Sequence, residues 1–367
     1  MGNRLAAVQE SALNRYQQLS PYLPALFFTG GFFFDILTLG RIDNILNIIS
    51  HGFFLVCTMA LVIMQITEVT PRLNAGTFEK IFFSYQNDAI HFMLGALLNA
   101  FVIFYFKSGS LMNTFLLLLV LFGLLLLNEV EFFKKKGPTL KMILLTISLC
   151  SFFIYLLPVL IGRTGAGIFL ASQFCAGVVI LALWQILLKF EVDFTRLSNY
   201  LLVPATSVIV IFSLLYAARI IPPVPLSLKQ IGIYHNIERQ NGDFILSHEN
   251  PGWKFWFRGD QKFMARENDR IFLFSRIFAP GGFKDKLYFH FQIKDLQNKW
   301  QTTDRIPLII VGGRDAGFRG YAYKQNYREG KWRALVETSE GLEIGRINFT
   351  VTNTLETAER HFIKERY

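Results

Sequence analysis

The chain has 367 residues, of which 52% are hydrophobic and only 17% are charged, and its formal net charge is +10 at pH 7. Soluble domains typically contain about 25% charged residues. This composition excludes an intrinsically disordered chain, and a count of three cysteines excludes a small disulfide-rich scaffold. In a membrane protein, positive charge first indicates orientation and contact with anionic lipid, so the sequence predicts membrane lipids rather than nucleic acid as partners.

The charged residues are unevenly distributed along the chain. Residues 1–221 hold 14 Lys/Arg and 10 Asp/Glu, whereas residues 222–367 hold 23 and 17, which together give the 37 and 27 of the whole chain. A long stretch with so few charges is typical of membrane-spanning helices. We therefore predict an amphipathic helix at residues 1–20, an all-α membrane bundle at 21–221 and a soluble domain beyond it.

Seven apolar segments in the first part are each close to the roughly 20 residues that a helix needs to cross a bilayer. They lie at residues 21–40, 45–67, 88–106, 110–128, 140–161, 166–188 and 199–220.

The basic residues between these segments predict the orientation of the chain. With the N-terminus in the cytoplasm, the cytoplasmic side carries Arg4, Arg15, Arg72, Lys80, Lys134, Lys135, Lys136, Lys141, Lys189 and Arg196, and the short loops of the opposite side carry Arg41, Lys107 and Arg163. This bias follows the positive-inside rule. An odd number of spans then places the C-terminal region outside the cytoplasm.

Polar side chains inside the apolar segments are candidates for a functional site, because it is costly to bury them in lipid. The candidates are Asp35, Arg41, Asp43, Asp88, His91 and Asn99. The first three indicate either an ion or proton site or a local Asp–Arg pair that steadies the end of the first segment, and the pair is the favoured interpretation. Asp88, His91 and Asn99 share one helical face, which either lines a polar cavity or forms hydrogen bonds between helices.

The region after Pro222 and Pro223 has the pattern of β-strands. Nine short segments are rich in aromatic and β-branched residues and are bounded by Gly, Pro, Asn or Asp. They lie at 231–237, 243–248, 253–257, 270–278, 286–293, 305–311, 318–324, 331–338 and 345–351. We predict an all-β, antiparallel, immunoglobulin-like sandwich over residues 222–353. Residues 354–367 are predicted to form a polar tail, helical or frayed.

Turn signals and alternation refine this prediction. Residues 328–330 and 339–341 each end in glycine and predict hairpins. Alternation predicts that one face of each of the last two strands fills the core; these residues are Trp332, Ala334, Val336, Ile347, Phe349 and Val351. Trp253, Trp256 and Trp300 either extend an aromatic binding face or fill the core, and core filling is the simpler interpretation.

Residues 312–324, GGRDAGFRGYAYK, are the leading candidate for a binding site. Alternation places Arg319, Tyr321 and Tyr323 on one face, with Arg314 in the preceding turn. Arginine and aromatic side chains stack on sugars and bind anionic groups. The alternative, which is the favoured interpretation, is that Arg319 is a buried arginine that braces a corner of the sandwich through hydrogen bonds to backbone carbonyls. Because the sequence shows no motif of a catalytic, metal or cofactor site, we predict no enzymatic activity and no cofactor.

The same segment, GGRDAGFRGYAYK, together with EGKWRALVETSEGLEIGRINFTV and IPPVPLSL, resembles bacterial multi-pass inner-membrane proteins that end in domain of unknown function 2914. In the membrane half, FFFDILTLGRID, HFMLGALLNAFVIFYFKSGS and LLLLNE also resemble the family pattern. His91 departs from that pattern, in which glutamine is expected, and this weakens a proton relay through His91. The resemblance implies a β-rich terminal domain in a Gram-negative envelope protein and supplies no activity.

We therefore expect an inner-membrane anchor with a periplasmic module that binds a protein partner or an envelope polymer such as a glycan. The contact residues of this module would be Arg314, Arg319, Tyr321 and Tyr323. A small transporter or ion-coupled protein is the first alternative, and a sensor that acts through a separate cytoplasmic partner is the second. The sequence is compatible with both a homo-oligomer and a hetero-oligomer.

Overall fold

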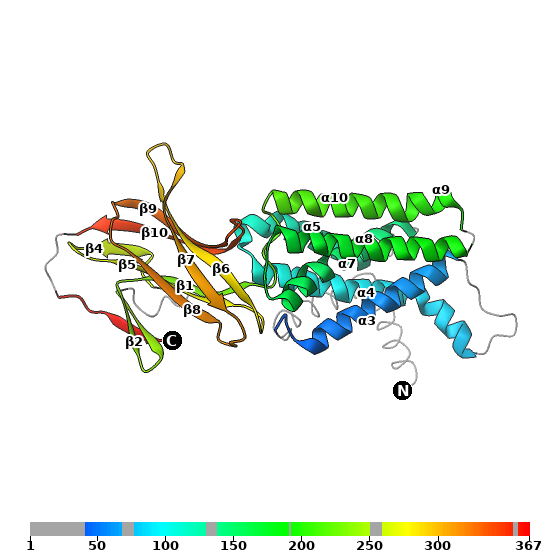
Figure 1. Ribbon diagram of the computed structural model, residues 1–367, viewed down its shortest axis with the longest axis horizontal. Coiled ribbons are helices and arrows are strands. Elements are labelled where there is room, and N and C mark those ends of the chain that lie inside the picture. The colour runs from blue at the N-terminus through cyan, green and yellow to red at the C-terminus, as the bar shows by residue number, and fades with distance from the viewer. Residues whose placement is uncertain (1–40, 68–76, 130–137, 191, 250–258, 355–358) are drawn as a thin grey trace, which may run out of the picture. The chain divides into compact units, whose positions relative to one another are not determined.

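The computed structural model describes residues 41–67, 77–129, 138–190, 192–249, 259–354 and 359–367 (Figure 1). The predicted amphipathic helix at 1–20, the first apolar segment and Asp35 lie outside the described residues. The chain divides into two compact units. The first comprises the described parts of Met1–Ile103, Leu119–Leu149 and Gly177–Val208, and the second comprises those of Phe104–Leu118, Cys150–Ala176 and Ile209–Tyr367.

The described part of the N-terminal region is helical. Its elements are α3 (Ile45–Ile66), α4 (Thr77–Ser108), α5 (Leu111–Glu129), α7 (Pro138–Ile161), α8 (Ala166–Lys189), α9 (Phe194–Leu197), the π-helix η1 (Ser198–Leu202) and α10 (Val203–Ala217). Among the described residues, five helical spans are long and apolar enough to cross a membrane: Ile45–Ile66, Tyr85–Ser108, Thr139–Ile161, Ala166–Lys189 and Phe194–Ala217. The prediction of several apolar helices is therefore confirmed.

Local chemistry sets the ends of these helices. Asn44 precedes α3, and its side-chain oxygen accepts a hydrogen bond of 2.9 Å from the backbone N–H of Leu46, as expected of an N-cap. Gly162 follows α7 and adopts a φ of 75°, the left-handed conformation that commonly ends a helix at glycine. The boundary predicted from hydropathy at 140–161 agrees with this end of α7.

The C-terminal region is built from β-strands. They are β1 (Ser227–Tyr234), β2 (Asn236–Gln240), β3 (Asp243–His248), β4 (Lys262–Ala265), β5 (Ile271–Phe278), β6 (Lys284–Lys294), β7 (Trp300–Val311), β8 (Phe318–Lys324), β9 (Gly330–Thr338), β10 (Glu343–Asn353) and β11 (Ile363–Arg366). They form a three-stranded sheet β1-β5-β8, a five-stranded sheet β4-β10-β9-β6-β7 and a second three-stranded sheet β11-β3-β2. The predicted strand at 253–257 lies outside the described residues.

The five-stranded sheet contains one parallel pair. β4 runs parallel to β10, with Thr350 opposite Lys262, whereas the other described neighbours in this sheet are antiparallel. The expectation of a purely antiparallel arrangement is therefore wrong at this edge. β4 has only four residues, which gives too short an alternation for a sequence pattern to detect.

Side chains from the sheets β1-β5-β8 and β4-β10-β9-β6-β7 form one hydrophobic core. The predicted inward positions of the last two long strands are confirmed, since all six belong to this core: Trp332, Ala334, Val336, Ile347, Phe349 and Val351. The residues between them on β9 and β10 face the other side of the sheet, because alternate side chains of a strand point to opposite faces. The burial pattern of β10 follows this alternation from Ile347 onward.

One of the two predicted hairpins is confirmed. β9 and β10 pair in antiparallel fashion across residues 339–341. The other prediction, a hairpin at 328–330, is wrong, because β8 pairs with β5 while β9 pairs with β6 and β10. The chain passes from one sheet to another at this point, and the left-handed Gly330, with a φ of 137°, begins β9 there.

The prediction of a helical or frayed tail over residues 354–367 is wrong for the last residues of the chain. Ile363–Arg366 form β11, which pairs in antiparallel fashion with β3. The unpaired edge of β3 supplies backbone hydrogen bonds that outweigh the weak β propensity of the polar residues in β11.

Two carboxylates of the β-strand region hold helix ends within the second compact unit. The backbone N–H and the hydroxyl of Thr164 donate to Asp285 at 3.1 and 2.8 Å. Glu340, in the turn between β9 and β10, accepts from the Ala166 N–H at 2.8 Å and from the Tyr216 hydroxyl at 2.9 Å. A carboxylate at the start of α8 satisfies its free N–H groups and is favoured by the helix dipole.

Candidate functional site

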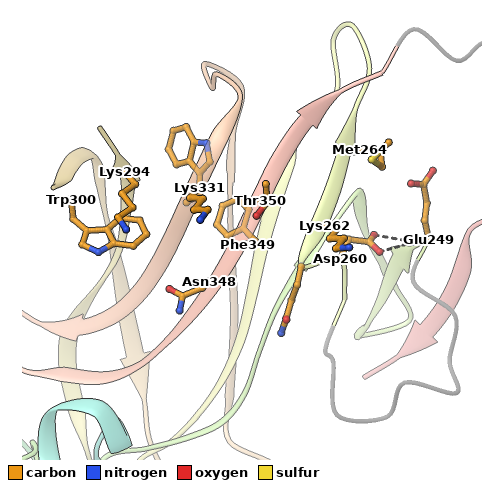
Figure 2. Close-up of a pocket in the computed structure, with 12 residues that line it drawn as sticks. Glu249, Asp260, Lys262, Met264, Lys294, Trp300, Lys331, Asn348, Phe349 and Thr350 are labelled. Carbon is orange, nitrogen blue, oxygen red and sulfur yellow. Dashed lines mark hydrogen bonds between the residues drawn. The ribbon is translucent and has the colours of Figure 1, made fainter. Parts of the chain in front are cut away.

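A groove of about 570 Å³ lies on the five-stranded sheet (Figure 2). Its lining comes from all five strands of that sheet, from the residue that follows β3 and from the two residues that precede β4. The residues are Glu249, Asp260, Gln261, Lys262, Met264, Lys294, Trp300, Lys331, Trp332, Asn348, Phe349 and Thr350. Trp332 and Phe349 belong to the core, so the core underlies the groove and the polar residues line it on the opposite face.

Strand register brings one row of side chains across the whole width of the sheet. Trp300 of β7 lies opposite Lys294 of β6, and Thr350 of β10 lies between Lys331 of β9 and Lys262 of β4. The pairing of β6 with β9 continues the row from Lys294 to Lys331. Since neighbouring strands are about 4.8 Å apart, the four intervals of this row span about 19 Å.

Arginine and lysine side chains surround the indole of Trp300. The guanidinium of Arg333 lies 4.4 Å from the Trp300 ring centre, and the Lys294 ammonium lies at 5.9 Å. Arg333 also donates to the side-chain oxygen of Gln292 at 2.5 Å. Burial lowers the pKa of Arg333, and the nearby charge of Arg346 adds to this effect. Contacts of this kind fix the ring in place on the outer face.

The acidic residues of the groove are occupied by other partners. Asp260 is buried and accepts two hydrogen bonds, of 2.9 and 3.1 Å, from the Glu249 backbone N–H. The Glu249 carboxylate pairs with Arg360 at 3.0 Å. Within the part of the chain that the structure describes, Lys262, Lys294 and Lys331 form no ion pair. The lining therefore presents excess positive charge, with Trp300 and Lys294 at one end and Lys262 near Asp260 at the other (Figure 2).

A buried histidine lies beside the acidic end of the groove. His235 stacks on Phe263 with ring centres 4.0 Å apart, and its Nε2 is 3.6 Å from Asp260. Burial, reinforced by the charge of Arg360, lowers the pKa of His235 to about 4. His235 is therefore neutral at neutral pH, and the positive charge of the groove comes from lysine.

The structure gives Arg319 an internal role. Its guanidinium donates to the carbonyl oxygens of Tyr367 at 2.8 Å and Gly242 at 3.1 Å, and it pairs with Asp243 at 3.3 Å. These bonds join β8 to the sheet that contains β3 and β11. The contacts match the alternative interpretation of Arg319, an arginine that braces a corner through backbone carbonyls.

Replacing Arg319 by alanine is expected to loosen the β11-β3-β2 sheet. The two carbonyl hydrogen bonds are lost, at a cost of about 2 kcal/mol. Hydrogen bonds from Arg366 and Arg319 hold the pKa of Asp243 below its ordinary value, so the variant raises this pKa. A carboxylate whose pKa is lower in the folded state than in the unfolded state stabilises the fold at pH values above its unfolded-state pKa. This stabilisation is lost as the pH falls through the folded-state pKa. It is smaller in the variant, because the pKa of Asp243 is less depressed there.

Hydrogen exchange measured by mass spectrometry tests this expectation. Amides of β3 and β11 should exchange faster in Arg319→Ala. The control is Arg366→Ala, because Arg366 also bonds Asp243, at 2.9 Å, but is largely exposed. Equal acceleration in both variants would show that the carbonyl bonds of Arg319 contribute nothing.

The other residues of the predicted C-terminal site are exposed. Arg314 lies in the loop before β8, and Tyr321 and Tyr323 are 44% and 48% exposed. Both tyrosine rings flank Phe272, at 6.5 and 5.8 Å. The structure thus brings the two tyrosines together on one side of β8, next to Arg319, whose guanidinium is already engaged.

The intramembrane candidates divide into a surface pair and buried groups. Arg41 pairs with Asp43 at 2.6 Å, as expected for a local ion pair. Asp88 lies in α4, and its side chain is outside the described part. His91 and Asn99 of the same helix are both buried.

Sequence reasoning missed a polar cluster in the first compact unit. Lys141 of α7 is only 3% exposed, and its ammonium donates to side-chain oxygens of Gln65 at 2.7 Å and Asn87 at 2.5 Å. The positive-inside pattern includes Lys141 only as one of the charges on the cytoplasmic side. The sequence does contain a signal for this cluster, because all three polar residues lie at the ends of predicted apolar segments. Lys141 lies at the start of segment 140–161, Gln65 near the end of segment 45–67, and Asn87 directly before segment 88–106.

Sequence reasoning also assigned Trp300 to the core, whereas the structure places it on the outer face of the sheet, in the groove. Trp253 and Trp256 lie outside the described residues. The alternation in residues 286–294 gives Lys294 an outward position, but only the strand order brings it next to Lys331.

The apolar helices followed by β-sheets define a helical, membrane-compatible region joined to a β-rich region. A family model described as a protein of unknown function (DUF2914) matches residues 284–351. This range runs from β6 to β10 and contains seven of the twelve groove residues: Lys294, Trp300, Lys331, Trp332, Asn348, Phe349 and Thr350.

No curated protein matches the chain. Among solved structures, the chain is similar to the Pseudomonas fluorescens alkylpurine DNA glycosylase AlkC bound to DNA with an abasic site analogue, at 10% identity and a TM-score of 0.23. This similarity covers 85% of the chain and 99% of the glycosylase.

Proposed function

We propose that the protein is a membrane-anchored binding protein without catalytic activity, and that the groove on its five-stranded sheet holds a component of the cell envelope. The observation that carries the proposal is the row of Trp300, Lys294, Lys331, Thr350 and Lys262 across the sheet. Lysine side chains that form no ion pair within the described part of the chain, gathered in a concave surface with an aromatic residue, are typical of a binding site.

The membrane part of the proposal is supported by the five apolar helical spans. We further propose that the membrane is the bacterial inner membrane, that the N-terminus is cytoplasmic and that an immunoglobulin-like β-region stands in the periplasm. The asymmetric distribution of Lys and Arg between alternate loops supports this orientation.

Site-specific photo-crosslinking in cells tests whether the groove is occupied. A photoreactive amino acid is introduced into the full chain at Lys331 or Thr350, both exposed in the groove. Irradiation should produce adducts that migrate more slowly than the chain itself. The control positions are Ile309 on β7 and Lys364 on β11, which are exposed outside the groove. Adduct yields at Lys331 and Thr350 no greater than at the controls would reject the proposal.

A further inference from the structure

We infer that the ligand of the groove is an anionic glycan, a sugar polymer that carries carboxylate or phosphate groups. The inference rests on the proposed function, because it names the class of molecule that the same groove binds. Three features of the lining support it: its charge, its mixture of polar and aromatic groups, and its direction across the strands.

The charge of the lining selects for an anion. Lys262, Lys294 and Lys331 lie along one row of the groove, whereas Asp260 and Glu249 are engaged with backbone and with Arg360. Ammonium groups bind carboxylate and phosphate through charge-assisted hydrogen bonds, which are the strong ones in protein sites. A row about 19 Å long offers several such contacts to one extended ligand.

The neutral part of the lining suits sugar units. Gln261, Asn348 and Thr350 supply amide and hydroxyl groups that both donate and accept hydrogen bonds, as sugar hydroxyls do. Trp300 contributes an apolar ring that Arg333 and Lys294 hold in place. A rigid aromatic ring with polar neighbours contacts the apolar face of a sugar at little entropic cost.

The position of the groove argues against two other anionic partners. A peptide commonly binds along one edge of a β-sheet, where its main chain adds a strand, but this groove runs across the face of the sheet from one edge strand to the other. A lipid bilayer presents a broad surface that does not enter a concavity of about 570 Å³. A flexible chain of sugar units enters the concavity and reaches all three lysines.

Calorimetric titration of the full chain, in nanodiscs of neutral phosphatidylcholine, tests the ligand class. The probes are oligogalacturonate as a carboxylate glycan, a phosphorylated dextran oligosaccharide as a phosphate glycan, neutral dextran of matched length, and polyglutamate as an acidic peptide. At least one anionic glycan should bind about tenfold or more tightly than neutral dextran and polyglutamate. The glycan that binds identifies the anionic group, and its affinity should fall with added salt.

A pair of matched double variants tests the location. Lys294→Ala/Lys331→Ala should weaken glycan binding by about tenfold or more, because charge-assisted hydrogen bonds are lost. Lys229→Ala/Lys364→Ala removes the same charge from exposed positions outside the groove and should leave the affinity unchanged. Trp300→Ala should weaken glycan binding but leave any weak polyglutamate binding unaltered.

The outcomes separate the inference from the function on which it rests. Crosslinked adducts in the groove without binding of either anionic glycan would overturn the ligand class and leave the binding function standing. Tighter binding of polyglutamate than of both glycans would do the same and indicate an acidic protein partner. Equal weakening by the two double variants would overturn the site, and failure of both crosslinking and titration would overturn inference and function together.

Discussion

Replacing Trp332 by alanine is expected to lower the free energy of unfolding of the β-rich region by about 3–5 kcal/mol, the usual cost of removing a large aromatic side chain from a core. Trp332 is 2% exposed and stacks on Phe349 at 6.3 Å between ring centres. Its indole N–H donates to the Arg328 carbonyl at 2.9 Å. The variant leaves a cavity beneath the groove and removes the donor to the Arg328 carbonyl.

Trp300→Ala is the matched control for this prediction, because it removes the same side chain from the outer face of the same sheet. Trp300 is half-buried, and its contacts with Arg333 and Lys294 are of the kind worth about 1 kcal/mol or less at exposed sites. Urea titration of the full chain in detergent, read by pulse proteolysis, should show a much larger decrease of the midpoint for Trp332→Ala. Equal decreases in the two variants would contradict the placement of the two tryptophans.

The sequence predicts the strands and their faces well because alternation is a local property. On β10, buried apolar positions alternate with outward ones from Ile347 onward, so burial there follows from the order of residues alone. On β9, alternation correctly places Trp332, Ala334 and Val336 in the core, although the position between the last two of them is buried as well. The apolar helices are also predicted from local sequence, since a run of about 20 consecutive apolar residues is typical of a membrane-spanning helix. These parts of the fold need no information about contacts distant in sequence.

The groove could not be predicted because it depends on contacts distant in sequence. Lys262, Lys294 and Lys331 meet only because β4, β10, β9 and β6 are neighbours in that order. The parallel pairing of β4 with β10 has no sequence signal in four residues. A lysine at an outward strand position is ordinarily a solvated side chain, so each lysine alone gives no reason to expect a site.

Arg319 illustrates a different difficulty. Its residue type and its place among glycines and tyrosines suit both binding and bracing, and local sequence does not distinguish them. The pairing of β11 with β3 distinguishes the two roles, because it brings the Tyr367 carbonyl within 2.8 Å of the Arg319 guanidinium. A sequence interpretation that leaves residues 354–367 as a tail offers no such acceptor to Arg319.

Gly312→Ala is expected to destabilise the β-rich region by about 3 kcal/mol or more, at the upper end of the cost of overpacking. A Cβ added at Gly312 would lie 1.9 Å from the carbonyl oxygen of Pro280 and 2.9 Å from Cβ of Phe283. The backbone has little freedom to move away, because the Gly312 N–H donates to the Phe283 carbonyl at 2.8 Å and the Gly313 N–H to that of Ala279 at 3.1 Å.

The control for this prediction is Gly281→Ala, in the segment that faces Gly312. A Cβ there has open space within 4 Å, and the residue is not in the left-handed region, so the change should be close to neutral. Thermal unfolding of the full chain in detergent, followed by circular dichroism at a β-strand wavelength, should show a clear decrease for Gly312→Ala alone. A normal unfolding temperature in that variant would contradict the close approach of the two segments. The expected decrease would mean that Gly312, the first glycine of GGRDAG, is required for packing. The groove lysines, rather than this glycine-rich loop, would then be the candidates for ligand binding.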